Sequence, residues 1–235
     1  MSMKRVVISL GGSVLVPSLE EHHIAEYAAI LRKLGKEHRL FVVVGGGGEA
    51  RRYIGVARTL GIDEATADEL GIQVTRLNAT LLAGALAQAA YPNIAESYRD
   101  AARFGESGKI VVMGGVIPGQ TTDAVAALLA EKVRADLIIN WTSVDGIYSA
   151  DPKRHPDAVR HSTLTPGELQ AIIRGDRLEA GSNTVFDTLA AKIIARSGIP
   201  LVVLDGRKPV DPRKAIKGKK GTLVSDTKGW KDIAF

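Results

Sequence analysis

Five short runs of apolar residues, rich in β-branched side chains, recur along the chain. They cover residues 6–10, 40–44, 110–113, 137–140 and 201–204. Runs of this length and composition are typical of strands buried on both faces of a parallel sheet. Longer stretches with helical spacing of apolar side chains separate them. The helical stretches include residues 24–34, 124–133 and 188–197, the last closing at Gly198-Ile199-Pro200.

The alternation of strands and helices predicts the fold class. It is typical of α/β proteins, so we expect a three-layer αβα sandwich with a mostly parallel central sheet. The chain has 235 residues and is 45% apolar, which is enough for one large domain spanning residues 1–235. No fixed-period repeat or low-complexity linker interrupts it. Two lobes sharing one sheet, residues 1–124 and 125–235, are the expected subdivision.

Glycines follow three of the predicted strands. They form Gly11-Gly12, the run Gly45 to Gly48, and Gly114-Gly115. The carboxyl ends of parallel strands meet at one edge of the sheet, where helix N-termini attract anions and glycine lets the backbone approach a phosphate closely. Arg51, in the first turn after the second cluster, adds charged donors. Any one glycine pair is better explained by a tight turn, but three at one sheet edge predict phosphoryl transfer.

Composition and charge exclude several classes. The chain lacks cysteine, so disulfides, thiol nucleophiles and thiolate metal sites are ruled out. Its net charge of +5 is concentrated in residues 207–220, which carry +6 and leave −1 elsewhere. No aromatic residue lies among these cations, so we expect a solvated strip and no nucleic-acid partner. The apolar start at 6–16 is broken by glycines, which argues against a signal peptide or membrane span, and cytoplasm is the expected location.

Other nucleotide and hydrolase motifs do not occur. There is no Walker A sequence, and residues 45–48 lack the glycine order of a dinucleotide site. The five histidines show no paired metal-ligand spacing, and no serine-hydrolase elbow is present. Zinc and serine-hydrolase mechanisms are therefore not expected.

A resemblance to a known protein family covers nearly the whole chain. The matching motifs are residues 7–13, 42–47, 121–124, 143–152 and 190–193. They resemble the amino acid kinase superfamily, and the block Val144-Asp145-Gly146-Ile147-Tyr148 is its most specific part. Residues 67–72 and 115–122 are similar to those of the archaeal-type UMP kinase branch. Residues 221–224 match the short final strand of that family.

The resemblance implies magnesium-dependent transfer of the γ-phosphate of ATP to UMP, giving UDP and ADP in pyrimidine nucleotide synthesis. Phosphoryl transfer depends mainly on positioning and on neutralising charge. Residues 1–124 would form the acceptor (UMP) lobe and residues 125–235 the ATP lobe. Magnesium would arrive with ATP, with no dedicated protein metal site. The family further implies a homohexamer built from dimers.

Site residues follow from the same resemblance. The ATP phosphates would meet Gly12, Ser13, Gly47 and Arg51, and the adenosine end would meet Thr142, Tyr148 and Asp151. UMP would be held by Gly46, Asp68, Val116, Ile117, Pro118, Gly119, Gln120, Thr121 and Thr122. Lys192 would stabilise the transferring group and Asp123 would orient the reactants. Ordinary alternatives stay open: Asp68 and Asp123 could act at helix starts, Tyr148 could cover a turn, and Lys192 could be a surface lysine.

One departure and two alternatives remain. Many members of the superfamily carry a lysine where this chain has Ser9, so Lys192, Arg51 and magnesium would have to supply the positive charge. Isopentenyl phosphate kinase typically has a histidine after the second glycine cluster, whereas Glu49-Ala50-Arg51-Arg52 follows here. A non-catalytic nucleotide-binding or storage protein on this scaffold is the second alternative. Residues 225–235 could be a free tail, or Trp230 and Phe235 could dock on a neighbouring subunit.

Overall fold

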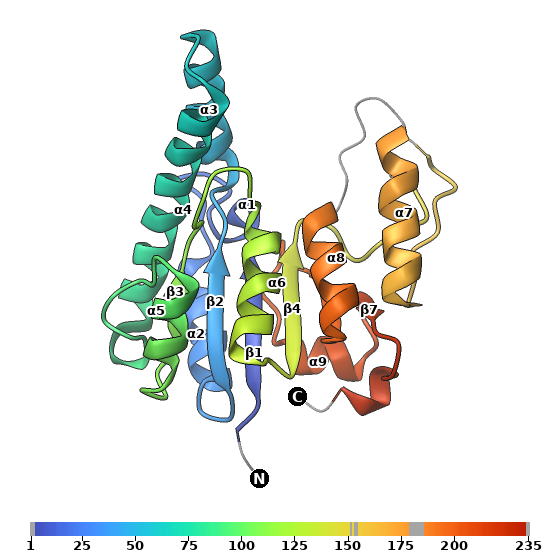
Figure 1. The fold of residues 1–235 in the computed structure, drawn as a ribbon. Coiled ribbons are helices and arrows are strands. Elements are labelled where there is room, and N and C mark those ends of the chain that lie inside the picture. Colours follow the sequence, from blue (N-terminus) through green and yellow to red (C-terminus); the bar gives the residue numbers. More distant parts are fainter. Residues whose placement is uncertain (1–2, 151, 153–154, 179–185, 234–235) are drawn as a thin grey trace.

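A single seven-stranded sheet runs through the protein (Figure 1). The computed structural model describes residues 3–150, 152, 155–178 and 186–233, with 175–178 described as backbone only. The strands are β1 (Arg5–Leu10), β2 (Arg39–Val44), β3 (Val111–Met113), β4 (Leu137–Thr142), β5 (Thr163–Leu164), β6 (Leu201–Asp205) and β7 (Thr222–Val224). Their order is β3-β2-β1-β4-β6-β7-β5, and all neighbours are parallel except β6 and β7. The predicted fold class and strands are confirmed.

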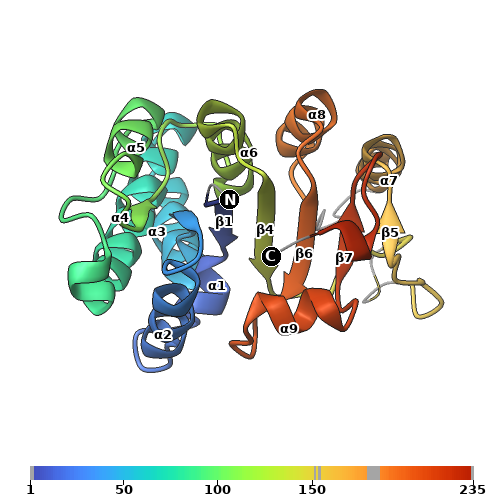
Figure 2. The same cartoon turned by 90° about the horizontal axis from the view of Figure 1, so that it is seen from below.

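Helices cover both faces of this sheet. They are α1 (Gly12–Leu15), α2 (Ile24–Leu34), α3 (Gly47–Thr59), α4 (Glu64–Leu86), α5 (Tyr98–Gly105), α6 (Thr122–Val133), α7 (Pro166–Leu178), α8 (Thr188–Ser197) and α9 (Pro212–Lys217). Figure 2 shows α2 and α9 on one face and α5, α6, α8 and α7 on the other. Helices α1 and α4 pack into the same core as α2 and α9. Short 3-10 turns occupy Ala87–Ala89 and Trp230–Asp232.

The side chains of each central strand divide between two cores. In β1, Val6, Ile8 and Leu10 pack toward α1, α2 and α4, whereas Val7 packs toward α5 and α6. Because both faces are covered, the strand needs apolar residues at successive positions. This is why the strands read as continuous apolar runs in the sequence.

Capping side chains set where several helices begin. Asp63 accepts the N–H of Thr66 at the start of α4, and Thr121 does the same for Ala124 at the start of α6. Asp187 accepts the N–H groups of Leu189 and Ala190 in α8. Helix α8 ends at Gly198 in the left-handed conformation, as the sequence predicts. The hydroxyl of Thr121 donates to Asp187, so α6 and α8 start next to each other.

Helices α3 and α4 form a hairpin that rises beyond this edge (Figure 1). Helix α4 is the longest, with 23 residues, and the apolar periodicity does not predict its full extent. The two-residue strand β5 is likewise too short to stand out in the sequence. The lobe boundary near residue 124 falls in the first turn of α6 and remains a prediction. Within the described ranges, none of the helices is both long and apolar enough to cross a bilayer.

The residues after β7 return to the body of the protein. Trp230 is only 8% exposed, and its indole N–H donates to the carbonyl of Ser162 at 3.2 Å. Ile233 is buried in the same core. The expectations of a free tail, or of docking on a neighbouring subunit, are therefore wrong for Trp230. A large aromatic ring gains more by filling the core of its own chain. Phe235 lies outside the described residues.

Replacing Trp230 tests this packing. We expect Trp230→Ala to lower the free energy of unfolding by about 3–5 kcal/mol, because a large buried ring leaves a cavity. Urea unfolding at several protein concentrations is the measurement. Trp230→Phe, which keeps much of the ring but loses the hydrogen bond, should cost less. A loss that appears only at concentrations where subunits associate would instead mean that the ring packs between chains.

Candidate active site

A cavity of about 300 Å³ opens at the carboxyl ends of β1, β2 and β3. It is lined by Gly12, Ser13, Gly45, Gly46, Gly47, Ala50, Arg51, Ile54, Asp68, Gly71, Ile72, Thr75, Gly115, Ile117, Gln120, Thr121 and Thr122. The three glycine clusters predicted to share a sheet edge therefore do meet. Most of the residues expected to hold UMP or the ATP phosphates lie here.

The first two glycine loops touch through their backbones. A Cβ atom on Gly12 would lie 2.2 Å from the Gly47 nitrogen and 2.4 Å from the Gly45 oxygen. Gly47 also has φ of +68°, a left-handed conformation that other residues rarely adopt. Only glycine can occupy both positions without moving the loops. Their amide groups are thus gathered into one small space.

Two side chains of α4, neither of them predicted from the sequence, hydrogen-bond to the glycine loops. Asn78, which is buried, donates from its amide nitrogen to the Gly45 oxygen at 3.0 Å. Thr75 accepts the N–H of Gly115 at 2.6 Å, and its hydroxyl donates to the Ile72 oxygen. A buried polar side chain requires such partners. The signal available in the sequence for these contacts was the presence of two polar residues on the inward face of an apolar helix.

Arg51 is the one cation among the described residues that line this cavity. Its side chain is exposed and makes no ion pair or hydrogen bond within the described part of the chain. The adjacent Arg52 differs, because its guanidinium pairs with Glu49 at 2.8 Å. Arg51 therefore keeps its planar set of donors available for a bound anion.

The loop between β3 and α6 is attached to both sides of the cavity. Asp68 accepts the N–H of Gly119 at 2.7 Å, and Gly119 has φ of +77°. Further along, the hydroxyl of Tyr98 donates to the side-chain oxygen of Gln120 at 2.9 Å. Burial raises the pKa of Tyr98 to about 12, so it remains a donor at neutral pH. Asp68 therefore anchors the loop and retains further acceptor capacity toward the cavity.

Behind the loop lies a cluster of polar side chains around Asp123. The hydroxyl of Ser9 donates to Asp123 at 2.8 Å, and Asn140, opposite Ser9 in the sheet, also hydrogen-bonds to it. Burial raises the pKa of Asp123 to about 6, and the nearby carboxylate of Asp187 acts in the same direction. The hydrogen bonds from Ser9 and Asn140 oppose this shift. Ser9 thus provides a neutral donor at the position where the family resemblance led us to expect a lysine.

Asp187 connects this cluster to the cavity. The hydroxyl of Thr121, which lines the cavity, donates to one oxygen of Asp187. The other oxygen accepts N–H groups at the start of α8. Sequence reasoning did not select Asp187, although an acid just before a helix is a common capping signal.

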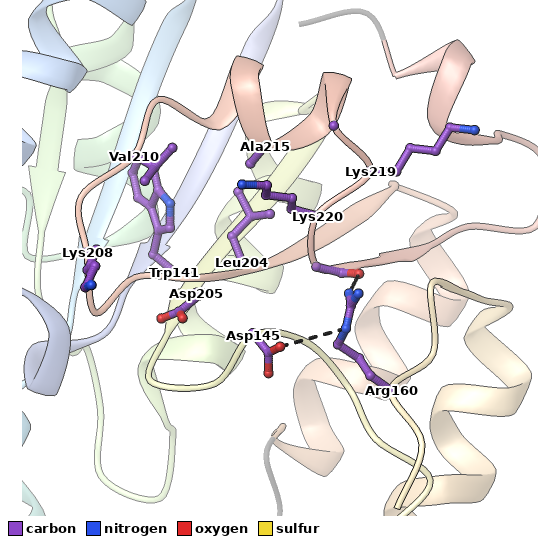
Figure 3. A pocket seen from close by; sticks show the side chains of 12 residues that line it. Trp141, Asp145, Arg160, Leu204, Asp205, Lys208, Val210, Ala215, Lys219 and Lys220 are labelled. Carbon is purple, nitrogen blue, oxygen red and sulfur yellow. Dashed lines mark hydrogen bonds and ion pairs between the residues drawn. The ribbon is translucent and has the colours of Figure 1, made fainter.

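A second cavity, of about 390 Å³, lies beside the carboxyl ends of β4 and β6. Its lining includes Trp141, Asp145, Arg160, Asp205 and Lys208 (Figure 3). Figure 3 also shows Lys219 and Lys220, so part of the basic strip borders this cavity instead of lying only in solvent. Since β4 is the neighbour of β1, the two cavities are adjacent along the sheet edge.

Two of the three predicted adenosine-binding residues, Thr142 and Tyr148, lie close to the second cavity without lining it. Thr142 ends β4, next to the cavity residue Trp141. The hydroxyl of Tyr148 donates to Asp145 at 2.9 Å, and this hydrogen bond raises the pKa of Tyr148. Asp145 also faces Arg160 at 3.9 Å. Asp151 lies outside the described residues.

Lys192 is exposed on α8, between the buried Ala191 and Ile193. It lines neither cavity and makes no ion pair within the described ranges. Its catalytic role remains a prediction. Val116, Pro118 and Gly119 likewise belong to the loop over the first cavity without lining it.

Comparisons with known proteins agree with this architecture. The chain matches the amino acid kinase family over residues 4–205, and it belongs to that family. A uridylate kinase of Methanoculleus marisnigri is 64% identical over 214 residues, covering 91% of this chain and 92% of that protein. One from Methanoregula boonei is 59% identical over 228 residues, covering 96% and 97%. The crystal structure of uridylate kinase from Archaeoglobus fulgidus superimposes with a TM-score of 0.84 at 46% identity, covering 95% of this chain and 100% of that one.

The contact between the glycine loops leads to a stability prediction. We expect Gly12→Ala to lower the free energy of unfolding by about 1–3 kcal/mol, because its Cβ overlaps backbone atoms that cannot move aside. Gly55→Ala is the matched control. Gly55 lies within α3, where an added Cβ would meet nothing within 4 Å, and the variant should gain up to about 1 kcal/mol. Equal effects of the two variants in urea unfolding would contradict the loop contact.

The buried carboxyl of Asp123 predicts a pH dependence in the metal-free protein. Its folded-state pKa is raised, so its proton is bound more tightly when folded, and stability falls as pH rises from about 4 through 6. Asp123→Asn removes this penalty. One pKa unit is about 1.4 kcal/mol, so the variant should gain up to about 3 kcal/mol relative to the native chain between about pH 4 and pH 7.5.

Asp63→Asn is the control of opposite sign for this measurement. Hydrogen bonds from Thr66 lower the pKa of Asp63, so its charged form stabilises the fold above about pH 4. The control should therefore lose stability relative to the native chain only as pH rises toward about 4. Between about pH 4 and pH 7.5, where the difference for Asp123→Asn grows, the difference for the control should stay constant. A stability difference for Asp123→Asn that does not vary with pH would rule out a raised pKa.

Proposed function

We propose that this protein transfers the γ-phosphate of ATP to UMP, producing UDP and ADP for pyrimidine nucleotide synthesis. The observation that carries this proposal is the pair of adjacent cavities along one sheet edge, the first of which is lined by the touching glycine loops. Two phosphorylated molecules can be bound end to end across such an edge. The uridylate kinases that share 64% and 59% of their residues with this chain support UMP as the acceptor.

In this mechanism, the first cavity receives UMP. The loop of residues 116–122 and the remaining acceptor capacity of Asp68 hold the nucleotide, and a carboxylate suits the two hydroxyls of a ribose. The amides around Gly46 face its phosphate. Tethering of the loop by Tyr98 and Asp68 restricts the orientation of the acceptor, which favours an in-line approach.

The ATP phosphates lie across the touching loops, beside Gly12, Ser13 and Gly47. Arg51 then counters the negative charge that develops as the phosphoryl group moves. The adenosine end extends toward the second cavity, near Thr142 and Tyr148. The second cavity is lined by Lys208, Lys219 and Lys220, which add positive charge where the adenosine end would lie.

A magnesium ion carried by ATP fits the polar cluster at the site. Magnesium is typically bound by one or two carboxylates together with substrate phosphates. Asp123 and Asp187 supply two carboxylates, and no group of three acidic or histidine side chains suited to a metal ion occurs among the described residues. When bound, the ion would neutralise phosphate charge. Asp123 and Asp187 would hold it, and Ser9 and Asn140 keep Asp123 in place.

Lys192 remains our candidate for a further positive charge on the transferring group. It has no partner within the described ranges, and Asp187 of the polar cluster caps the start of α8. Its present exposure means that it would have to turn toward bound ATP. Because Ser9 is neutral, the reaction here depends on Arg51, Lys192 and the metal ion for positive charge.

An oligomer is also proposed, with a hexamer as the expected form. The protruding α3–α4 hairpin exposes a set of large apolar side chains: Tyr53, Val56, Leu60, Leu77 and Leu81. A concentration of such residues on one projection is typical of a contact surface between chains.

The alternatives predict different acceptors. Isopentenyl phosphate kinase activity would require a site for an apolar tail on the acceptor, whereas the first cavity carries Arg51, Asp68, Gln120 and three threonines. A binding or storage protein would show no turnover. Measuring ADP formation with UMP, CMP, isopentenyl phosphate and glutamate separates these cases, and we expect turnover with UMP that requires magnesium.

Arg51 provides the sharpest test of the site. We expect Arg51→Ala to reduce kcat/KM for UMP phosphorylation about 10- to 100-fold, since a charged hydrogen bond contributes about 1.5–3 kcal/mol. Arg52→Ala is the matched control, because Arg52 pairs with Glu49 and does not line the cavity. If the two variants lose activity equally, Arg51 does not bind phosphate.

A further inference from the structure

A third cavity, of about 280 Å³, lies at the opposite end of the sheet. It opens where β1 and β2 begin, between the C-terminal ends of α5 and α6. Its lining includes Arg5, Arg39, Lys132, Arg134 and Glu106. Strands of six residues separate it from the active site by roughly 17–20 Å. The proposed kinase reaction does not use it.

The charges around this cavity are unbalanced. Among its described lining residues, four cations face the single carboxylate of Glu106. Arg39, Lys132 and Arg134 make no ion pair or side-chain hydrogen bond within the described residues. Like charges gathered around a concave surface repel one another and create a strong positive potential. A bound anion would relieve this repulsion.

Other surface arginines of this protein are mostly paired. Arg58 pairs with Glu64 at 2.8 Å, and Arg196 pairs with Glu131. The cations at the third cavity therefore differ from most described surface arginines in having no carboxylate partner. Arg5 is additionally fixed in place, since its guanidinium donates to the Val133 oxygen at 3.2 Å. Its backbone N–H donates to Asp136 at 2.8 Å.

Arg134 occupies a position that favours glycine. It follows α6 with φ of +52°, in the left-handed conformation typical of helix C-caps. An arginine there carries backbone strain that glycine would avoid. Backbone strain at a residue that lines a cavity is consistent with a functional side chain.

Neutralisation of helix dipoles explains only part of this cluster. Lys132 lies in the last turn of α6, where a cation is favourable in any case. Arg5 and Arg39 instead begin strands, so no helix end accounts for them. The ring of Phe41 forms the floor of the cavity. Helix α5 packs directly against this ring, because a Cβ on Gly105 would lie 2.5 Å from it. The site thus combines an apolar floor with a cationic rim.

We propose that this cavity binds a compact oligophosphate through its pyrophosphate group. Arginine forks and a lysine are the donors that phosphate oxygens prefer, and several adjacent charges favour a ligand with more than one phosphate. The pyrophosphate group could belong to the free inorganic ion or to the end of a nucleoside triphosphate. The volume of about 280 Å³ suits this group better than a whole dinucleotide.

Calorimetric titration with inorganic pyrophosphate tests the proposal. The protein is first saturated with UMP and a non-hydrolysable ATP analogue, so that the active site is filled. We expect one further binding event, which weakens as salt is raised. A second titration with a nucleoside triphosphate distinguishes the two sources of the group. If neither compound gives a further binding event at low salt, the proposal is wrong.

Variants connect the binding event to the cavity. Arg39→Ala and Lys132→Ala should each weaken pyrophosphate binding about tenfold or more. Lys33→Ala is the matched control for Lys132, because Lys33 is also an exposed lysine in the last turn of a helix, α2. Binding that is weakened equally by the control, or unchanged in both cavity variants, would overturn the assignment.

Arg134→Gly separates a loss of pyrophosphate binding from a loss of folding. It removes a cation from the cavity and also relieves the strained backbone, so the variant should melt at the same temperature as the native chain or higher. Its pyrophosphate binding should nevertheless be weaker. ADP formation without pyrophosphate should be unchanged in every cavity variant, which keeps this result independent of the proposed kinase activity. Full binding by Arg134→Gly would exclude Arg134 from the site.

Discussion

The direct contact between two glycine loops is the constraint on which the rest of the active site depends. Gly12 and Gly47 lie so close that a single methyl group on either would overlap backbone atoms of the other loop. This contact is possible because β1 and β2 are parallel neighbours and both end at the same level of the sheet. It brings backbone amides from two strand ends together, and Asn78 of α4 fixes the second loop from beneath. Everything else in the site, including the loop carrying Gly119, is arranged around this backbone surface.

Charge is distributed around this surface in a way that suits phosphoryl transfer. Arg51 has no partner within the described residues, whereas Asp123 is buried with neutral donors on two sides. Amides and a free guanidinium can accept phosphate charge without first breaking an ion pair. The carboxylates of Asp123 and Asp187 suit a metal ion that arrives with the nucleotide. The family to which the chain belongs accounts for the overall plan. Ser9 is neutral, so the side chain that donates to Asp123 from β1 adds no positive charge to the site.

Much of the fold could be predicted from the sequence because buried parallel strands require apolar residues on both faces. The five predicted strands and the end of α8 at Gly198 were found in this way. The glycine clusters were also correctly predicted to meet. Strand β5 was not predicted because a strand of two residues shows no periodicity. The burial of Trp230 was not predicted because its partner, Ser162, is distant in the chain. Asn78 and Thr75 were marked only as polar residues on an apolar helix, and their partners in the glycine loops are distant in the chain. The second cavity likewise depends on tertiary contacts. The binding and catalytic roles assigned to the site residues, Lys192 and Asp151 among them, remain predictions.

The central claim is that the amides of the touching loops bind phosphate. A crystal structure of the protein with UMP and a non-hydrolysable ATP analogue tests it most directly. The account predicts phosphate oxygens within hydrogen-bond distance of the Gly12 and Gly47 amides, with the guanidinium of Arg51 beside them and UMP under the loop of residues 116–122. Phosphates bound away from these amides, or a UMP molecule outside the first cavity, would contradict it.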